Sequence, residues 1–255
     1  MPGKRLRPSR GGAAAALIVS IVCAGAAPQA SGSARLSSLP VADSAAVGTR
    51  TNGRIFATVP GRGTSFCSGT ALNTPSRSVV LTAAHCILDR GVRATRLAFV
   101  PAYDHGRRPF GTFLATSTRV MERWRLTEST GYDLGALIVA PNARGRLIDV
   151  VGARGWVTGR SRLSRFQIFG YPAASLFGQE LRTCAGAGLG SDPHSDPGPP
   201  TVPSLCDMAA GASGGGWLLD GQYLNGVTSY GYPHGRRLFS PYFGLAAAAF
   251  LRSLP

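Results

Sequence analysis

GASGG at residues 211–215 places one serine among small residues, and two upstream segments complement it. VLTAAHC at residues 80–86 supplies a histidine, and YDLGAL at residues 132–137 supplies an aspartate. A serine hydroxyl is a poor nucleophile until a base takes its proton, and that base needs an acid that fixes its tautomer. In chain order, the candidate catalytic residues are His85, Asp133 and Ser213.

The serine segment suits the charge that forms during acyl transfer. The attacked carbonyl becomes an oxyanion, and backbone N–H groups must approach it closely. Gly211 has no side chain to shield its N–H, two positions before Ser213. A glycine-rich run by itself would equally suit a flexible turn, and it is the histidine and aspartate segments that favour the catalytic interpretation.

The histidine and the aspartate each stand in a supporting context. Ala83 and Ala84 allow tight packing at the turn that carries His85. Asp133 precedes an apolar run, where a carboxylate is costly unless it is paired, and orienting His85 supplies that partner. A cap at the start of the strand is the alternative role for Asp133. The remaining histidines lie in loops rich in turn formers and are expected on the surface: His105, His194 and His234.

Short apolar runs between turn residues predict an all-β chain of two antiparallel β-barrels, over residues 51–145 and 146–255. The Ala-rich segment at residues 243–251 predicts a C-terminal helix. The predicted strands are 55–59, 66–72, 79–82, 96–100, 110–120, 134–139, 155–157, 165–170, 179–184, 215–219, 223–229 and 238–239.

The three catalytic segments resemble those of secreted bacterial serine proteases of the chymotrypsin fold, in the trypsin-like and glutamyl-endopeptidase-like branch. The resemblance covers approximately residues 53–252. It implies an active site in the cleft between the two barrels, with His85 and Asp133 on the first and Ser213 on the second. It also implies that the backbone N–H groups of Gly211 and Ser213 form the oxyanion hole.

The N-terminal segment predicts a secretory signal peptide over residues 1–27. Basic residues precede an apolar stretch at residues 13–24, and small residues follow for a signal peptidase. An uncleaved anchor helix is the alternative, but the stretch is short for a span of about 20 residues. Residues 28–50 are small and polar and predict a short pro-segment or linker. We therefore expect a secreted, extracellular protein with no membrane contact after signal cleavage.

Loss of the signal peptide removes Cys23 and leaves four cysteines, which allow three pairings. Proximity along the chain favours Cys67–Cys86 and Cys184–Cys206. The resemblance implies the first pair, because family members join the cysteine after the catalytic histidine to one on the preceding strand. Each bridge would contribute about 3 kcal/mol, and an oxidising compartment outside the cytosol suits them.

The chain is strongly basic. Its net charge is +15, and subtracting the four signal-peptide cations leaves +11. Such a surface would adsorb non-specifically to polyanions; the alternative is codon bias in a GC-rich genome, with charge that serves solubility. The arginines are scattered, and no motif for specific nucleic-acid binding occurs. The sequence offers no cluster of metal ligands, and the proposed chemistry needs no metal or organic cofactor.

The resemblance also implies where substrate binds. Ser229, Tyr230 and Gly231 resemble the strand that pairs with the substrate backbone and forms one wall of the S1 pocket, and Gly231 would keep that pocket open. Thr228 stands where glutamyl endopeptidases carry a histidine, which argues against a preference for Glu.

Asp207 is the candidate specificity residue. It lies six residues before Ser213, the separation at which trypsin carries the aspartate that selects Arg or Lys. In trypsin the matching cysteine follows that aspartate, whereas here Cys206 precedes Asp207. The alternative is therefore that Asp207 satisfies backbone donors in a loop that is threaded differently.

Two functions are consistent with these residues. The first is a secreted serine endopeptidase that hydrolyses proteins or peptides through an acyl-enzyme, with a trypsin-like preference for a basic P1 residue. The second is a catalytically inactive protease homologue that acts as a secreted cationic binding protein. An esterase on the same triad is a minor alternative. The α/β-hydrolase esterases carry their triad in the order Ser, Asp, His, whereas this chain has the order His, Asp, Ser. A monomer is expected.

Overall fold

The computed structural model describes residues 37–255, apart from residues 175, 194–195, 197 and 233–234. The predicted signal peptide, Cys23 and residues 28–36 of the predicted pro-segment lie outside the described residues, as do His194 and His234. In the part of the chain that the structure describes, no helix is both long enough and apolar enough to cross a membrane.

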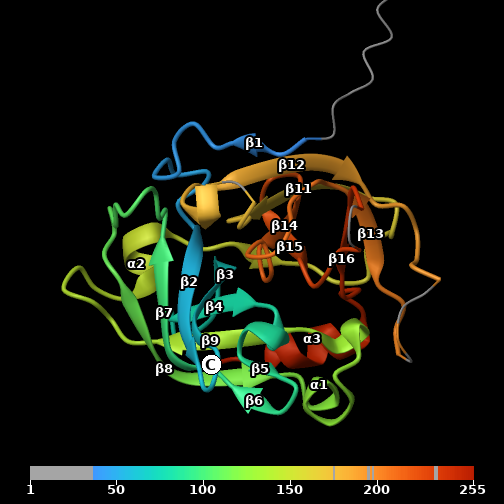
Figure 1. Ribbon diagram of the computed structural model, residues 1–255, viewed down its shortest axis with the longest axis horizontal. Helices are drawn as coiled ribbons and strands as arrows, with labels where there is room; N and C mark the ends of the chain where they lie inside the picture. The colour runs from blue at the N-terminus through green and yellow to red at the C-terminus, as the bar shows by residue number, and fades with distance from the viewer. Residues whose placement is uncertain (1–36, 175, 194–195, 197, 233–234) are drawn as a thin grey trace, which may run out of the picture. The chain divides into compact units, whose positions relative to one another are not determined.

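Six antiparallel strands close the first barrel, drawn from blue to yellow-green in Figure 1. Their order around the barrel is β2-β3-β4-β9-β8-β7. The alternation of side chains along each strand carries Ile55, Phe99 and Leu137 into the interior, where each is fully buried. The strands are β2 (Asn52–Val59), β3 (Gly63–Leu72), β4 (Val79–Thr82), β7 (Thr95–Pro101), β8 (Phe113–Val120) and β9 (Gly135–Val139), which confirms the six predicted strands of this half.

The second half contains a six-stranded sheet, in the order β1-β12-β11-β14-β15-β10, and a two-stranded sheet of β13 and β16. All neighbours are antiparallel except β10 and β15, which are parallel. The strands are β1 (Leu39–Pro40), β10 (Gly155–Trp156), β11 (Arg165–Gly170), β12 (Arg182–Ala187), β13 (Val202–Leu205), β14 (Gly216–Leu219), β15 (Tyr223–Val227) and β16 (Arg237–Ser240).

Two isolated bridges connect these sheets into the predicted second barrel. Gly188, directly after β12, pairs with Ser204 of β13. Tyr230, beyond the end of β15, pairs with Phe239 of β16. The bridges complete the ring β11-β12-β13-β16-β15-β14. Between β12 and β13, and between β15 and β16, a single residue pair takes the place of a full ladder of hydrogen bonds. Pro203 in β13 has no N–H to donate, which suits a strand with little ladder pairing.

The sequence analysis missed several short elements, none longer than six residues. They are the strands β1, β5 (Leu88–Asp89), β6 (Val92–Arg93) and β13, the helices α1 (Glu122–Thr127) and α2 (Leu147–Val151), and the 3₁₀ helices η1 (Ala84–Cys86), η2 (Thr130–Tyr132) and η3 (Leu176–Gly178). The predicted C-terminal helix is α3 (Leu245–Arg252). Strand β12 begins three residues later than predicted, because Ile168 of β11 pairs with Cys184 and sets its register.

One cluster of buried side chains joins the two halves of the chain. Leu72 and Leu81 contribute from the first barrel, and Phe169 and Leu218 from the second half. Leu251 of α3 packs into the same cluster. This shared core brings the turn after β4 close to the loop before β14, and these two segments carry His85 and Ser213.

Candidate active site

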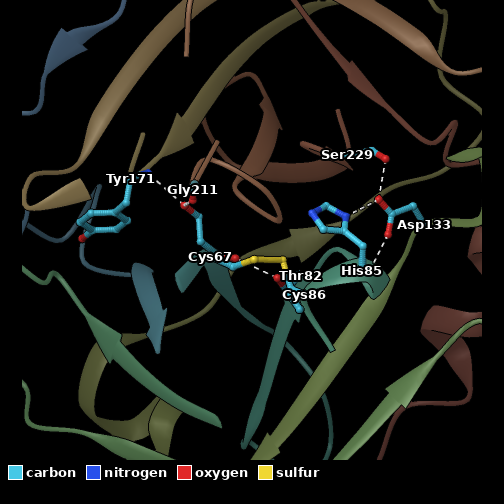
Figure 2. The surroundings of a disulfide bond; sticks show 9 residues. Cys67, Thr82, His85, Cys86, Asp133, Tyr171, Gly211 and Ser229 are labelled. Carbon is cyan, nitrogen blue, oxygen red and sulfur yellow. Dashed lines mark hydrogen bonds and ion pairs between the residues drawn. A yellow bond between two sulfur atoms is a disulfide. The ribbon is translucent and has the colours of Figure 1, made fainter. Parts of the chain in front are cut away.

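His85 and Asp133 meet beside the first barrel (Figure 2). Helix η1 carries His85 just after β4 ends, and Asp133 follows η2 directly. His85 Nδ1 donates to Asp133 Oδ2 at 2.7 Å, and the His85 backbone N–H donates to Asp133 Oδ1 at 2.9 Å. An ionised carboxylate only accepts hydrogen bonds, so Nδ1 carries a proton, and in the neutral form of the ring Nε2 is the acceptor.

Small residues allow these two segments to approach. A Cβ atom on Gly135 would lie 2.9 Å from Ile87 Cδ1 and 3.0 Å from Ala84 Cα. Ala83 and Ala84 are fully buried. The packing therefore explains why alanines precede His85 and why glycine follows the aspartate segment.

Burial and pairing act in opposite directions on the two titratable groups. Burial alone would lower the pKa of His85, but the Asp133 carboxylate outweighs it, so the pKa of His85 is raised from its ordinary value. Burial alone would raise the pKa of Asp133, but the charge of His85 and the hydrogen bonds from His85 and Ser229 lower it. Asp133 is therefore held as a carboxylate, and the imidazolium form of His85 is favoured beside it.

Ser229 has a role that the sequence analysis missed. Its hydroxyl donates to Asp133 Oδ2 at 2.5 Å, and the residue is buried (Figure 2). The carboxylate thus accepts three hydrogen bonds, as a buried charge requires. A signal existed in the sequence, because a buried aspartate needs several donors and Ser229 follows a buried strand. Its partner lies 96 residues away, however, and spacing along the chain does not reveal it.

The loop that carries Ser213 is held through its carbonyl groups. All four carbonyls of residues 210–213 accept a hydrogen bond from the protein. In chain order the donors are Ala173 N at 2.6 Å, Ser68 Oγ at 2.8 Å, Gly215 N at 2.9 Å and Ser68 N at 2.7 Å. The peptide planes of this loop are therefore fixed.

The N–H groups of the same loop divide into two kinds. Ala212 N donates to Ala209 O at 3.1 Å, and Gly214 N donates to Thr228 O at 2.7 Å. Within the described residues, the N–H groups of Ala210, Gly211 and Ser213 donate to no acceptor. Gly211 and Ser213 line a pocket with His85, so their N–H groups are available to a ligand oxygen there.

Glycine is required on both sides of Ser213. Gly211 has a φ of 91° and Gly214 a φ of 78°, in the left-handed region that favours glycine. A Cβ atom on Gly214 would lie 2.0 Å from Thr82 Oγ1, and one on Gly211 would lie 2.4 Å from the Phe66 ring. The backbone angles and close packing of the GASGG segment therefore require glycine at positions 211 and 214.

Ser213 lies on the wall between two pockets. One pocket, of about 360 Å³, is also lined by His85, Gly211 and Phe66. The other, of about 490 Å³, is also lined by Asp207, Ser229, Tyr230, Gly231 and Arg237. The structure thus places His85 and Asp207 in two pockets that share Ser213, whereas Asp133 lines neither pocket and is bonded to His85 and Ser229.

Asp207 contributes to a pocket and also satisfies a backbone donor. Its Oδ1 accepts from the Ser38 backbone N–H at 2.7 Å, next to β1. The residue is exposed and lines the pocket beside Ser213. The hydrogen bond from Ser38 therefore matches the alternative role of Asp207 as an acceptor for a backbone donor, and its specificity role stays a prediction.

Asp192 was missed because it lies in a segment dense with turn formers. Its Oδ2 accepts from the hydroxyls of Tyr230 at 2.6 Å and Tyr232 at 2.9 Å. Tyr230 stacks on Phe239 with ring centroids 4.6 Å apart. Burial and the hydrogen bond to Asp192 raise the pKa of Tyr230, so this ring is held as a neutral phenol.

Two disulfides border the site, with the pairing that proximity along the chain predicted. Cys67 bonds to Cys86, next to His85, and Cys184 bonds to Cys206, next to Asp207 (Figure 2 shows the first). Among the described residues, the two groups of His, Cys and Asp side chains close enough to hold a metal ion each include one of these bridges. Disulfide sulfurs are not thiolate ligands, so neither group suits a metal.

Comparison with known proteins gives consistent matches. Residues 46–248 match the family described as Trypsin. The crystal structure of the protease Anisep from Arthrobacter nicotinovorans is 33% identical, with a TM-score of 0.72 over 78% of this chain and 93% of that chain. The thermostable serine protease AL20 from an extremophilic microorganism is 30% identical, with a TM-score of 0.74 over 80% of this chain and 96% of that chain.

A more distant structure shares the fold. A Glu endopeptidase in complex with MPD is 20% identical, with a TM-score of 0.68 over 84% of this chain and 94% of that chain. No curated protein matches the sequence.

Proposed function

The chain belongs to the trypsin family of serine proteases, and we propose that it is a secreted endopeptidase that hydrolyses peptide bonds through an acyl-enzyme on Ser213. One observation carries this proposal. Gly211 and Ser213 line a pocket together with His85 of the His85–Asp133 pair, and among the described residues their N–H groups have no acceptor.

The proposed reaction uses each of these groups once. Ser213 Oγ attacks the peptide carbonyl while His85 Nε2 takes its proton, and His85 then gives that proton to the leaving amine. Asp133 holds the Nδ1–H tautomer and stabilises the imidazolium. The N–H groups of Gly211 and Ser213 bind the oxyanion. Water attacks the acyl-enzyme by the same route in reverse and releases the acid.

The substrate backbone is proposed to bind as an extended strand along residues 229–231. The Ser229 N–H and the Tyr230 carbonyl are already paired with Phe239 of β16. Among the hydrogen bonds between described residues, the Ser229 carbonyl and both backbone groups of Gly231 have no backbone partner. A substrate strand would pair with these groups, as an added strand pairs with a sheet edge.

The proposed P1 preference is for Arg or Lys, and Asp207 supports it. Asp207 lines the pocket beside Ser213, and a carboxylate there would bind a cationic side chain. Arg237 lines the same pocket and presents the opposite charge. The preference therefore depends on which of these two charges the P1 side chain meets.

A fluorogenic peptide panel with Arg, Lys, Phe, Leu, Ala and Glu at P1 tests both the proposed endopeptidase activity and the proposed P1 preference. We expect cleavage after Arg and Lys by the wild type and none by Ser213→Ala. Asp207→Asn should reduce kcat/KM for the Arg substrate about 10- to 100-fold, since a hydrogen bond between charged groups contributes about 1.5–3 kcal/mol. The matched control is Asp220→Asn, which changes an exposed aspartate in the turn after β14. It should leave kcat/KM for the Arg and Lys substrates unchanged.

The other outcomes of the panel are informative. Cleavage after Glu would assign the pocket charge to Arg237, and cleavage after an apolar residue would remove the specificity role of Asp207. Turnover that survives in Ser213→Ala would overturn the mechanism. Silence of the wild type towards both the panel and a serine-directed covalent inhibitor would favour an inactive, cationic binding protein, because such a protein has no activated serine.

Export is the remaining part of the proposal. Two disulfides suit an oxidising compartment, and the predicted signal peptide at residues 1–27 would direct the chain there. N-terminal sequencing of the protein from culture medium would place the mature N-terminus, which we propose lies within or after residues 28–50. Size-exclusion chromatography of that material tests the proposed monomer.

A further inference from the structure

We propose that Ser68 is a positioning residue for the oxyanion hole, an inference that rests on the proposed function. Ser68 lies in β3, directly after Cys67, and only 1% of it is exposed. Its hydroxyl accepts a hydrogen bond from the Tyr171 backbone N–H at 2.9 Å and donates one to the Gly211 carbonyl at 2.8 Å. One hydroxyl of the first barrel therefore ties together two loops of the second half.

The backbone of Ser68 strengthens this connection. Its N–H donates to the Ser213 carbonyl at 2.7 Å, and its own carbonyl accepts from the Thr82 hydroxyl at 2.8 Å. Ser68 thus bonds the carbonyls of the first and the last residue of the segment 211–213. The N–H groups of those two residues have no acceptor among the residues that the structure describes.

The segment that begins at Tyr171 fixes the Gly211 N–H more directly. Ala173 N donates to the Ala210 carbonyl at 2.6 Å. The C=O and N–H of a trans peptide point in opposite directions, so this bond turns the Gly211 N–H away from Ala173. The Ser68 hydroxyl holds both Tyr171 and the carbonyl on the far side of Gly211, so the two peptides that flank Gly211 are anchored together (Figure 2 shows Tyr171 beside Gly211).

Gly211 needs such an external restraint because of its own chemistry. With a φ of 91° and no side chain, it has more backbone freedom than any other residue type would have. A rotation of its peptide would move the N–H away from the oxyanion. The hydroxyl of Ser68 supplies a restraint that the loop sequence itself lacks.

Loss of this restraint should affect the transition state and spare the ground state. The oxyanion exists only in the transition state and in the tetrahedral intermediates, so a misdirected N–H weakens catalysis without weakening substrate binding. Removal of one oxyanion donor lowers kcat about 100- to 1,000-fold. Reorientation of one donor should lower it less, by about 10-fold, with KM within a factor of two.

The test compares Ser68→Ala and Ser68→Thr with the wild type, on the best substrate of the P1 panel and after active-site titration. Ser68→Ala should lower kcat about 10-fold and weaken inhibition by a peptide boronic acid, which forms a tetrahedral adduct, by the same factor. Inhibition by the cleaved product peptide should stay the same. Ser68→Thr keeps the hydroxyl and should recover most of kcat.

Ser204→Ala is the matched control. Ser204 is a fully buried serine of β13 whose hydroxyl donates to the Ala187 carbonyl at 3.0 Å, away from the loop that carries Ser213. It should lose stability as Ser68→Ala does but keep kcat and the boronate affinity. If Ser68→Ala does not fold, Ser68→Cys takes its place, because a thiol is a weaker donor of similar size, and a smaller fall in kcat is expected.

Two results would overturn the inference while leaving the proposed function intact. One is a wild-type kcat in Ser68→Ala, or in Ser68→Cys if the alanine variant does not fold. The other is a fall in kcat without any loss of boronate affinity. Activity of the wild type and inactivity of Ser213→Ala are established first in the same assay, so failure of the proposed function would be seen separately.

Discussion

At the scale of single residues, His85 is the group whose protonation state should control activity. Its pKa is raised, since the attraction of Asp133 outweighs the effect of burial. His85 acts as a base only when it is neutral, so raising its pKa shifts the onset of activity to higher pH. The proton also binds more tightly to the folded state than to the unfolded state.

The pH profile of kcat/KM tests this balance. We expect the acidic limb to have an apparent pKa above about 6.5, the ordinary value for histidine. Asp133→Asn should move that limb to lower pH and reduce kcat about 10,000-fold, through loss of the correct tautomer. Asp149→Asn, which removes an exposed partner of Arg77, is the control and should change neither. An acidic limb below 6.5 in the wild type would contradict the raised pKa.

The raised pKa of His85 also predicts the direction in which the free energy of unfolding changes with pH. A raised folded-state pKa means that His85 contributes its full stabilisation below its unfolded pKa of about 6.5 and loses it as pH rises through the folded pKa. The contribution of His85 to the free energy of unfolding therefore decreases with rising pH in the range where activity appears. The proposed mechanism therefore uses the neutral form of His85, which stabilises the fold less than the imidazolium form.

At the scale of secondary-structure elements, the two disulfides attach short segments to strands. Cys67–Cys86 joins β3 to η1, and Cys184–Cys206 joins β12 to the segment after β13. The first bridge adjoins His85 and the second adjoins Asp207. Each therefore holds one side of the candidate site in addition to restricting the unfolded chain.

Paired Cys→Ser variants separate these contributions. Each double variant should lower the free energy of unfolding by about 3 kcal/mol, given sequence separations of 19 and 22 residues. Cys67→Ser with Cys86→Ser should also lower kcat, whereas Cys184→Ser with Cys206→Ser should raise KM and largely spare kcat. Urea unfolding and steady-state kinetics on the oxidised proteins provide the measurements. Equal effects of the two variants on kcat would argue against this division.

At the scale of the whole molecule, the two halves share one hydrophobic cluster. Side chains from both halves and from α3 pack into it. Halves that share a core should unfold together, unlike domains that are joined only by a linker. The candidate catalytic residues come from both halves, so stability of this core and assembly of the site are coupled.

Calorimetry tests the shared core. We expect one unfolding transition with equal calorimetric and van't Hoff enthalpies. Leu251→Ala, in the buried face of α3, should lower the free energy of unfolding by about 2–5 kcal/mol without splitting the transition. Leu126→Ala, an exposed leucine of α1, should change it by less than about 0.5 kcal/mol. Two resolved transitions in the wild type would show that the halves unfold independently.

The sequence by itself determined the features that depend on local pattern. Short apolar runs between turn residues placed the strands of the first barrel within three residues, and the local context of three short segments made His85, Asp133 and Ser213 the candidate catalytic residues. Two cysteine pairs followed from proximity along the chain. These features lie within short segments, where residue type and spacing carry the information.

Only the tertiary structure decided the features that join distant segments. The Ser229 hydroxyl reaches Asp133 across 96 residues, and the Ser68 hydroxyl reaches Gly211 across 143. The closure of the second barrel by single bridges is of the same kind. A hydroxyl has no preferred partner in the sequence, because it can donate to any acceptor that packing brings within 3 Å or so. Packing of the two halves therefore selects these contacts.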